Sequence, residues 1–256
     1  MKSFDEVFSE RRSVRRYTTR RISGKLKSRV LDAAMRAPTA GNLMLYSVIE
    51  IEDQAIKQRL SVTCDNQPFI ADAPWVLVFL ADYQRMMDCF TFAGACVEQR
   101  EAERPLAADL LLACCDAIIA AETAVVAAEA CGLGSCYIGD IMENYETHRD
   151  LLNLPRYTFP VAMVCFGFPT AQQRKRPQPT RFPRRIIVHR NAYRKITRVD
   201  MEEMYPPGLD GENIPAGSGA HLDAAHQVRA LYERKFASAF AAEMRRSVSA
   251  MLENWR

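Results

Sequence analysis

The longest apolar run of the chain, residues 106–131, constrains the fold more than any other feature. The run is long enough to cross a membrane, but unpaired charges are costly in lipid, and four carboxylates interrupt it: Asp109, Asp116, Glu122 and Glu129. Pro105 precedes the run and Gly132 and Gly134 follow it, which is typical of a helix start and a helix end. The sequence therefore predicts a buried helix, whose many alanines allow close contact with other helices and with a second subunit.

Runs without helical spacing predict strands around this helix. Residues 46–51 are rich in β-branched side chains, and residues 75–80 and 160–166 are apolar throughout, as strands buried on both faces should be. Residues 186–188 form a shorter strand-like run. Apolar residues at helical spacing predict further helices over residues 26–37, 56–60, 144–152 and 222–255. Residues 200–221, rich in Pro and Gly, are interpreted as an extended linker.

Composition places the chain among soluble globular proteins. Its 256 residues, 48% hydrophobic and 25% charged, suffice for one sizeable core with an appendage. We expect a domain over residues 1–195 and a linker with a helix over residues 196–256. No apolar signal segment opens the chain, because charge begins at Lys2, so a cytoplasmic location without membrane attachment is expected.

The eight cysteines form no C-x-x-C pair and no spacing typical of zinc. Most lie in apolar runs, which favours small core residues in a reducing compartment over disulfides or metal ligands. No metal is expected. The four histidines occupy no recognisable catalytic context, and we interpret them as surface or structural residues.

The distribution of charge is more informative than its total. A net charge of +3 gives little support to nucleic-acid binding. However, no acidic residue occurs between Arg11 and Leu31 or between Leu151 and Val199, while both tracts are rich in Arg and Lys. If the fold brings the two tracts together, they form a site for an anion.

The first tract opens with a cluster of arginines, Arg11-Arg12-Ser13-Val14-Arg15-Arg16-Tyr17. It follows a short amphipathic run in which Ser3 and Glu6 have the spacing of a capping box. Arginine offers a planar fork of donors that stays charged, and serine adds a neutral donor, so the cluster can hold a phosphate. The alternative is a solvated basic helix end.

Two further segments allow two interpretations each. The glycines of residues 132–139 either let backbone amides approach a planar ligand or form a turn from helix to strand. The Met- and Phe-rich residues 86–92 either line a pocket or pack a helix against the core. Neither a dinucleotide fingerprint after a strand nor a Walker phosphate loop is present.

Six segments in order resemble the FMN-dependent nitroreductase family. They are residues 11–17, residues 37–42, Asn66-Gln67 before Ala73-Pro74, residues 116–139, Leu154-Pro155 with Pro160 and residues 167–169, and residues 181–183. The resemblance covers roughly residues 4 to 194. It implies an α+β fold, in which helices wrap a central, mostly antiparallel sheet and two chains form an intertwined homodimer with FMN at the interface.

The resemblance also implies an activity. FMN would take hydride from NAD(P)H and reduce nitroaromatic, quinone or related conjugated small-molecule acceptors by a ping-pong mechanism, with no partner nucleic acid. The flavin carries the chemistry, so no catalytic side chain is expected. This agrees with the absence of a recognisable nucleophile or base.

Site residues carried over by position fall into four groups. The phosphate or ribityl chain would be held by Arg11, Arg12, Ser13 and Arg181. The pyrimidine edge of the flavin would be reached by Arg15, where a positive charge tunes its reduction. The other subunit would cover the cofactor with Pro38, Thr39 and Asn42. The ring would also meet the side chain of Gln67 and the backbone of Cys136, Tyr137, Ile138 and Gly139.

The sequence departs from the familiar members of the family in two places. Phe69 stands where some nitroreductases carry a lysine close to the flavin, and residues 196–256 exceed the minimal fold. We expect this extension to embrace the partner subunit. Two other functions stay open: the same fold performing reductive dehalogenation or flavin-consuming chemistry, and a non-enzymatic basic binding module.

Overall fold

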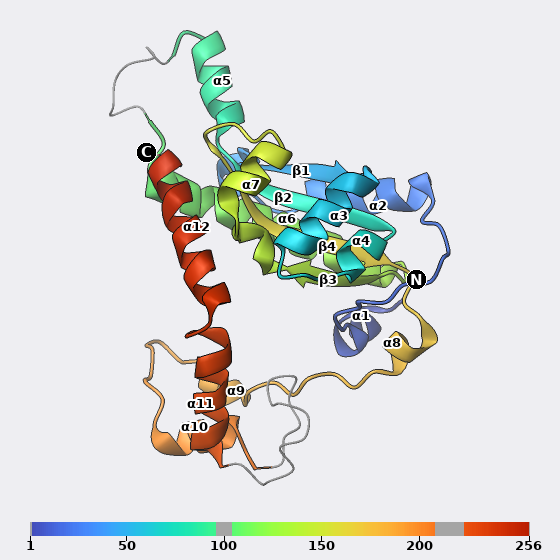
Figure 1. Ribbon diagram of the computed structural model, residues 1–256, viewed down its shortest axis with the longest axis vertical. Coiled ribbons are helices and arrows are strands. Elements are labelled where there is room, and N and C mark those ends of the chain that lie inside the picture. The colour runs from blue at the N-terminus through green and yellow to red at the C-terminus, as the bar shows by residue number, and fades with distance from the viewer. Residues whose placement is uncertain (1, 96–103, 208–222, 256) are drawn as a thin grey trace. The chain divides into compact units, whose positions relative to one another are not determined.

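One antiparallel sheet organises the structure, a computed structural model that describes residues 2–95, 104–207 and 223–255 (Figure 1). The strands are β1 (Tyr46–Ile51), β2 (Trp75–Asp82), β3 (Gly134–Ile138) and β4 (Thr158–Gly167). Their order is β1-β2-β4-β3, and each neighbouring pair is antiparallel. The expected α+β fold with a mostly antiparallel sheet is confirmed.

The chain divides into two units, Met1–Arg176 with Glu243–Arg256, and Pro177–Ala242. The first unit contains the sheet and the helices α1 (Phe4–Glu10), α2 (Gly24–Met35), α3 (Gln54–Thr63), α4 (Phe69–Asp72), α5 (Gln84–Phe92), α6 (Ala107–Ala130), α7 (Tyr145–Leu151) and α8 (Ala171–Lys175), with the 3-10 turns η1 (Ala40–Asn42) and η3 (Gly139–Met142). The second unit contains α9 (Arg184–Ile187), α10 (Arg198–Met204) and α11 (Ala224–Lys235). The last helix, α12 (Ala239–Trp255), starts in the second unit and continues in the first.

Both faces of the sheet are buried, as the apolar runs predict. Alternate residues of a strand point to opposite faces. In β2, Trp75, Leu77 and Phe79 therefore join the core cluster under α2 and α6, whereas Val76 and Val78 join the one under α3 and α4. Figure 1 shows these helix pairs on opposite sides of the sheet. Every residue of β2 and β4 is buried.

Helix α6 is the predicted central helix. By length and composition alone it could cross a membrane. One face, however, packs on α2 and the sheet through buried alanines, and its Asp116 and Glu129 are buried with hydrogen-bond partners. The packing favours a buried core helix, and Gly132 (φ 80°) ends it by a left-handed turn that favours glycine.

The N-terminal capping box is also confirmed. The Ser3 hydroxyl accepts a hydrogen bond from the Glu6 amide, and the Glu6 carboxylate accepts one from the Ser3 amide, at 2.6 Å. The box starts α1 directly before the arginine cluster. Helix α2 ends at Met35, three residues before Pro38, in agreement with the expected stop near Ala37.

Three expectations about local structure are wrong. The strand-like run 186–188 lies at the end of α9, which starts after Pro183 and closes with a hydrogen bond from the Val188 amide to the Arg184 carbonyl. The expected linker over residues 200–221 overlaps α10, which a capping box of Thr197 and Asp200 starts; residues 208–221 lie outside the described part. The third is the single helix over residues 222–255, whereas the interpretation of residues 132–139 as a turn from helix to strand is confirmed by β3.

The single expected helix over residues 222–255 is two helices. Helix α11 ends at Lys235, and the hydroxyl of Ser238 then accepts a hydrogen bond from the Ala241 amide at 3.3 Å, which caps a new helix. The first expected residue, 222, lies outside the described residues.

Helix α12 belongs to the core of the first unit. Trp255 is 1% exposed and meets Tyr157 edge-on, with ring centroids 5.7 Å apart. Arg246 pairs with Glu146 of α7, and the Tyr145 amide donates to Ser247 Oγ at 3.1 Å. The unit boundaries at 176/177 and 242/243 therefore differ from the expected division at 195/196. That these residues also embrace a second subunit stays a prediction.

Candidate functional site

The arginine cluster is an extended segment fixed across the ends of two strands. Ser13 forms a parallel bridge with Ser135 of β3, and the Val14 amide donates to the Ser135 carbonyl at 2.8 Å. Tyr17 bridges Pro169 just after β4. The segment is thus a rigid attachment to the sheet, and the alternative of a solvated helix end is wrong.

Two glycines make this attachment possible. A Cβ atom built on Gly134 would lie 2.6 Å from Val14 Cγ2, and one on Gly167 would lie 2.5 Å from the Tyr17 ring. Real Cβ atoms do not approach other atoms so closely, so only glycine lets Val14 and Tyr17 pack flat on the sheet. Gly134 therefore serves the contact with Val14, while Gly132 makes the turn from helix to strand. The approach of a planar ligand to the backbone of residues 136–139 stays a prediction.

The fold brings the two acid-free tracts together over residues 11–18 and 168–176, which meets the condition for a shared anion site. Arg12 donates through one terminal nitrogen to the carbonyls of Arg174 and Arg176, and through Nε to the Glu10 carbonyl at 3.0 Å. The Arg15 amide donates to Gln173 Oε1 at 3.1 Å. Part of the Arg12 guanidinium is therefore committed to the chain itself.

Arg181 belongs to the second unit. Its expected part in the phosphate site therefore stays a prediction. Gln173, which is 9% exposed and fixes the Arg15 backbone, is a residue that the sequence did not single out. In the sequence, only its position in the second basic tract indicated that Gln173 could belong to the site.

Arg15 lies beside the predicted backbone contacts in β3. Burial raises the pKa of the Cys136 thiol, and a hydrogen bond and the positive charge of Arg15 lower it, with a net increase. Cys136 is thus a neutral thiol rather than a nucleophile. The next residue, Tyr137, is exposed, and its hydroxyl donates to Glu122 Oε2 of α6 at 3.2 Å.

The predicted cover, residues 38–42, lies at the other edge of the sheet. It leads into β1, one edge strand of the described sheet, whereas the arginine cluster joins β3, the opposite edge strand. Pro38 and Asn42 are exposed, and Thr39 Oγ1 accepts a hydrogen bond from the Met44 amide at 3.3 Å. Within one chain the two parts therefore lie at different edges of the described sheet, and their joint contact with one cofactor stays a prediction.

Gln67 and Gly139 come together at η3. Gln67 Nε2 donates to the Cys64 carbonyl at 2.9 Å and to Asp140 Oδ2 at 2.8 Å. Asp140 directly follows Gly139, so two predicted cofactor contacts from distant parts of the chain share one turn. Asp140, which orients the Gln67 amide, could not be found from the sequence because nothing in its spacing links it to Gln67.

A second carboxyl group beside this turn binds a proton near neutral pH. Glu143 is 5% exposed, and its Oε1 has no hydrogen-bond partner among the described residues. Burial, followed by the charges of Asp140, Asp65 and Glu243, raises the pKa of Glu143 to about 8. Because the folded state holds this proton more tightly than the unfolded state, stability is lost as the pH rises from the unfolded pKa through the folded one.

We expect Glu143→Gln to weaken the dependence of the free energy of unfolding on pH. The variant should match the wild type near pH 5, roughly where Glu143 is protonated in the folded chain, and should be more stable above about pH 8. Urea unfolding over this range measures the difference. Glu146→Gln is the control, because Arg246 already lowers the pKa of Glu146 to about 2. Parallel stability curves for wild type and Glu143→Gln would contradict the assigned proton.

His148 is structural, as expected. It is fully buried, its Nδ1 lies 2.8 Å from the Ile141 carbonyl oxygen, and its Nε2 lies 2.8 Å from Thr63 Oγ1. Burial lowers the pKa of the imidazole. The ring therefore stays neutral, and its contact with the Ile141 carbonyl stabilises η3.

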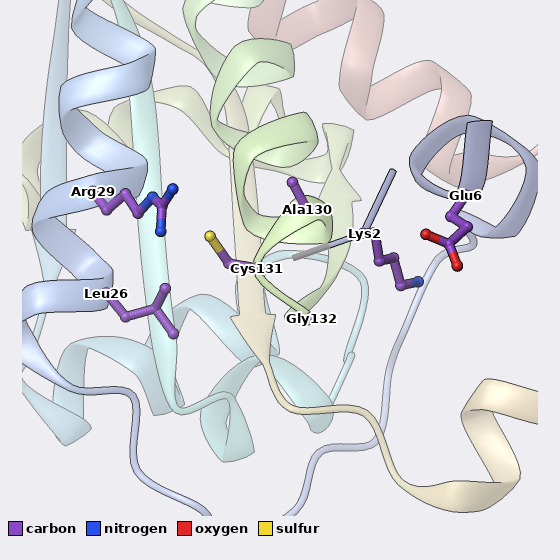
Figure 2. A pocket seen from close by; sticks show the side chains of 7 residues that line it. All are labelled: Lys2, Glu6, Leu26, Arg29, Ala130, Cys131 and Gly132. Atoms are coloured by element: carbon purple, nitrogen blue, oxygen red, sulfur yellow. The ribbon is translucent and has the colours of Figure 1, made fainter. Parts of the chain in front are cut away.

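A pocket of about 400 Å³ lies between α2, the end of α6 and the N-terminal segment (Figure 2). It is lined by Lys2, Glu6, Leu26, Arg29, Ala130, Cys131 and Gly132. None of the predicted site residues is among them. The Lys2 ammonium pairs with Glu129 at 2.7 Å and Glu10 at 3.0 Å, so its charge serves to fasten the N-terminal segment to α6.

Comparison with known proteins decides the family. A sequence model described as "Nitroreductase family" matches residues 8–168, which is more than half of the chain. The chain belongs to the nitroreductase family. The matched part of this nitroreductase contains the arginine cluster, residues 38–42, Gln67 and β3, and it excludes Arg181.

Individual relatives agree with this assignment. The chain is 30% identical over 191 residues to an oxygen-insensitive NADPH nitroreductase of Salmonella typhimurium, covering 75% of each chain. It is 31% identical over 189 residues to an FMN reductase [NAD(P)H] of Bacillus subtilis, covering 72% of each. The structure of NfrA2 from B. megaterium matches with a TM-score of 0.80 and 26% identity, over 100% of this nitroreductase and 98% of that chain.

Proposed function

We propose that this nitroreductase is an NAD(P)H-dependent flavin oxidoreductase that binds FMN. The observation that carries the proposal is the attachment of residues 11–17 to β3, which sets permanent cations beside the open backbone at the end of that strand. The printed names of the relatives, an NADPH nitroreductase and an FMN reductase, support the same cofactor and electron donor.

The residues present fit FMN. Arg11, Ser13 and Arg15 are half-buried on one short segment, and guanidinium and hydroxyl donors suit a phosphate and a carbonyl edge. A Cβ atom on Gly139 would meet no heavy atom within 4 Å, so a flat ring can approach this backbone. These four residues offer cationic donors, a neutral donor and a glycine with free space above its backbone, which suits an anionic, planar group.

When bound, FMN supplies the chemistry by accepting hydride from NAD(P)H and passing reducing equivalents to an acceptor. The residues of the chain bind and orient it. Arg11 and Ser13 would hold the phosphate end, while Arg15 would place a positive charge at the pyrimidine edge, where charge favours reduction. Asp140 fixes the Gln67 amide for a contact with the polar edge of the ring.

A second copy of the chain would complete the site. Helix α6 turns a second apolar face outward, on which Leu111 is 67%, Leu112 43% and Ile118 42% exposed. Burial of such a face is favourable, at about 25 cal/mol for each Å². In a homodimer, residues 38–42 of one chain can cover the cofactor held by the arginine cluster of the other, since one chain carries these parts on opposite edges.

The acceptors that we propose are nitroaromatics, quinones and related conjugated molecules, reduced by a ping-pong mechanism. Helix α5 contains residues 86–92, where acceptor choice would be determined. Met86 and Met87 pack partly against the core, as the packing interpretation expects, whereas Phe92 is 87% exposed. That these residues also line a pocket stays part of the proposal. One open flavin face that serves donor and acceptor in turn accounts for the ping-pong order.

The test is spectroscopic. We expect the purified protein to show a flavin absorption spectrum, and NADH or NADPH to bleach it under anaerobic conditions. A nitroaromatic or a quinone, added after the nucleotide is removed, should restore the oxidised spectrum. If no flavin copurifies and added FMN does not bind, the proposed function is wrong; if reduction requires the acceptor to be present, the ping-pong order is wrong.

A further inference from the structure

A buried carboxylate in α6 has no place in the chemistry proposed above. Asp116 is 2% exposed and lies in the most apolar helix of the chain. A buried charge is costly unless hydrogen bonds satisfy it. Among the described residues no basic side chain forms an ion pair with it, so its partners must be sought in the backbone.

Asp116 holds both ends of one loop. Its Oδ1 accepts a hydrogen bond from the Ala40 amide at 2.9 Å, and its Oδ2 accepts one from the Leu45 amide at 3.1 Å. Hydrogen bonds to a carboxylate are stronger than those between neutral groups. The carboxylate therefore pins residues 40–45 to α6 from the inside.

The pinned loop has an unusual backbone. Gly41 (φ 55°), Asn42 (φ 58°) and Met44 (φ 50°) are all in the left-handed region. Methionine rarely adopts this conformation, which persists only where the surroundings enforce it. Strain of this kind is typical of functional loops, and here Asp116 is the group that enforces it.

An arginine holds the same loop from outside. Arg85 at the start of α5 donates to the Met44 carbonyl at 2.6 Å and to the Tyr46 carbonyl at 2.7 Å. Asp116 thus accepts hydrogen bonds from two backbone amides of residues 40–45. Arg85 donates to the Met44 carbonyl in this loop and to the Tyr46 carbonyl directly after it. The result is a preformed shape that leaves Leu43 and Met44 41% and 43% exposed.

We propose that Asp116 is a positioning residue for the cofactor: it fixes residues 40–45 in the shape that covers the FMN bound by a second copy of the chain. The inference rests on the proposed function, because it assigns residues 38–42 to the partner's FMN. Preformed loops bind more tightly, since no ordering entropy is lost on binding. The carboxylate acts through the loop and does not touch the cofactor.

Asp116→Asn tests this role. The amide keeps the size of the side chain, but its NH₂ group faces one of the two backbone donors, so one hydrogen bond is lost. We expect about tenfold weaker FMN binding, which corresponds to about 1.4 kcal/mol, together with faster hydrogen exchange of the Ala40 and Leu45 amides. Circular dichroism and sedimentation should show a folded dimer.

Asp109→Asn is the matched control. Asp109 is a carboxylate of the same helix that also accepts a backbone hydrogen bond, from the Leu106 amide at 2.8 Å. It should change stability without changing FMN affinity. If Asp116→Asn does not fold, Arg85→Met releases the loop from outside and should weaken FMN binding in the same direction. Unchanged affinity in a folded variant at either position would overturn the proposal.

Mixed dimers test whether the loop acts on the other subunit. Arg15→Ala removes a proposed cofactor contact, and Asp116→Asn disturbs the cover, so neither homodimer should bind FMN tightly. In a mixed dimer, one site combines the intact Arg15 of one chain with the intact loop of the other. Coexpressed subunits should therefore regain tight FMN binding, and no recovery would overturn action across the interface. If wild type itself fails to bind FMN, the proposed function fails instead.

Discussion

Replacing Gly134 with alanine is expected to dislodge the arginine cluster from the sheet. The new Cβ atom would lie 2.6 Å from Val14 Cγ2 and 2.9 Å from Val14 Cβ, so the segment itself has to move. Overpacking of this kind costs about 1–3 kcal/mol of stability. Because Arg15 follows Val14 directly, FMN affinity should fall more than tenfold, or by more than about 1.4 kcal/mol. Titration of the apoprotein with FMN measures it.

Two further variants make this result specific. Gly24→Ala is the control, because a Cβ there meets nothing within 4 Å, and neither stability nor affinity should fall. Adding Val14→Ala to the Gly134→Ala chain removes the two methyl groups of the clash and should restore part of the affinity. If Gly134→Ala binds FMN as the wild type does, the segment is not the fixed support described here.

Trp255→Ala should have the largest effect on stability. The indole is 1% exposed and packs on Tyr157 in the main core cluster. Removing a buried tryptophan leaves a cavity and costs about 3–5 kcal/mol. Urea unfolding of the variant should show this loss. Such a loss would show that the first unit needs α12 in order to fold stably.

Phe92→Ala is the matched aromatic control. Phe92 is 87% exposed, so its removal should change stability by less than about 0.5 kcal/mol. A cost below about 1 kcal/mol for Trp255→Ala would mean that α12 contributes little to its own core. The expectation that the C-terminal extension mainly embraces a partner would then gain support.

Most of the sheet could be predicted because β1, β2 and β4 carry continuous apolar or β-branched runs. The sequence left β3 as one of two interpretations of residues 132–139, because its five residues include a glycine and a serine and its strand conformation depends on pairing with β4. Residues 186–188 have strand-forming side chains, yet they end a short helix after Pro183. In both places tertiary or local hydrogen bonding outweighs intrinsic preference.

The site was predictable where one physical property marked it. The absence of acids along two tracts indicated an anion site on the condition that the tracts meet, and Arg12 does reach the carbonyls of Arg174 and Arg176. Asp116 carried a visible signal, a charge in an apolar helix, but the sequence could not say which amides it binds. The contact of Val14 with Gly134 was also beyond prediction, because a glycine's empty space is filled by whatever the fold brings there.

The attachment of the arginine cluster has a consequence for the order of folding. The Tyr17 hydroxyl bonds to the Cys165 carbonyl, 148 residues later in the chain, and Arg12 reaches Arg174, 162 residues later. Closing such long loops is entropically costly and is rewarded only once β3 and β4 exist. The cluster therefore acquires its fixed conformation only after nearly the whole domain has folded. If the cluster holds FMN as proposed, the cofactor binds only to chains whose sheet is already complete.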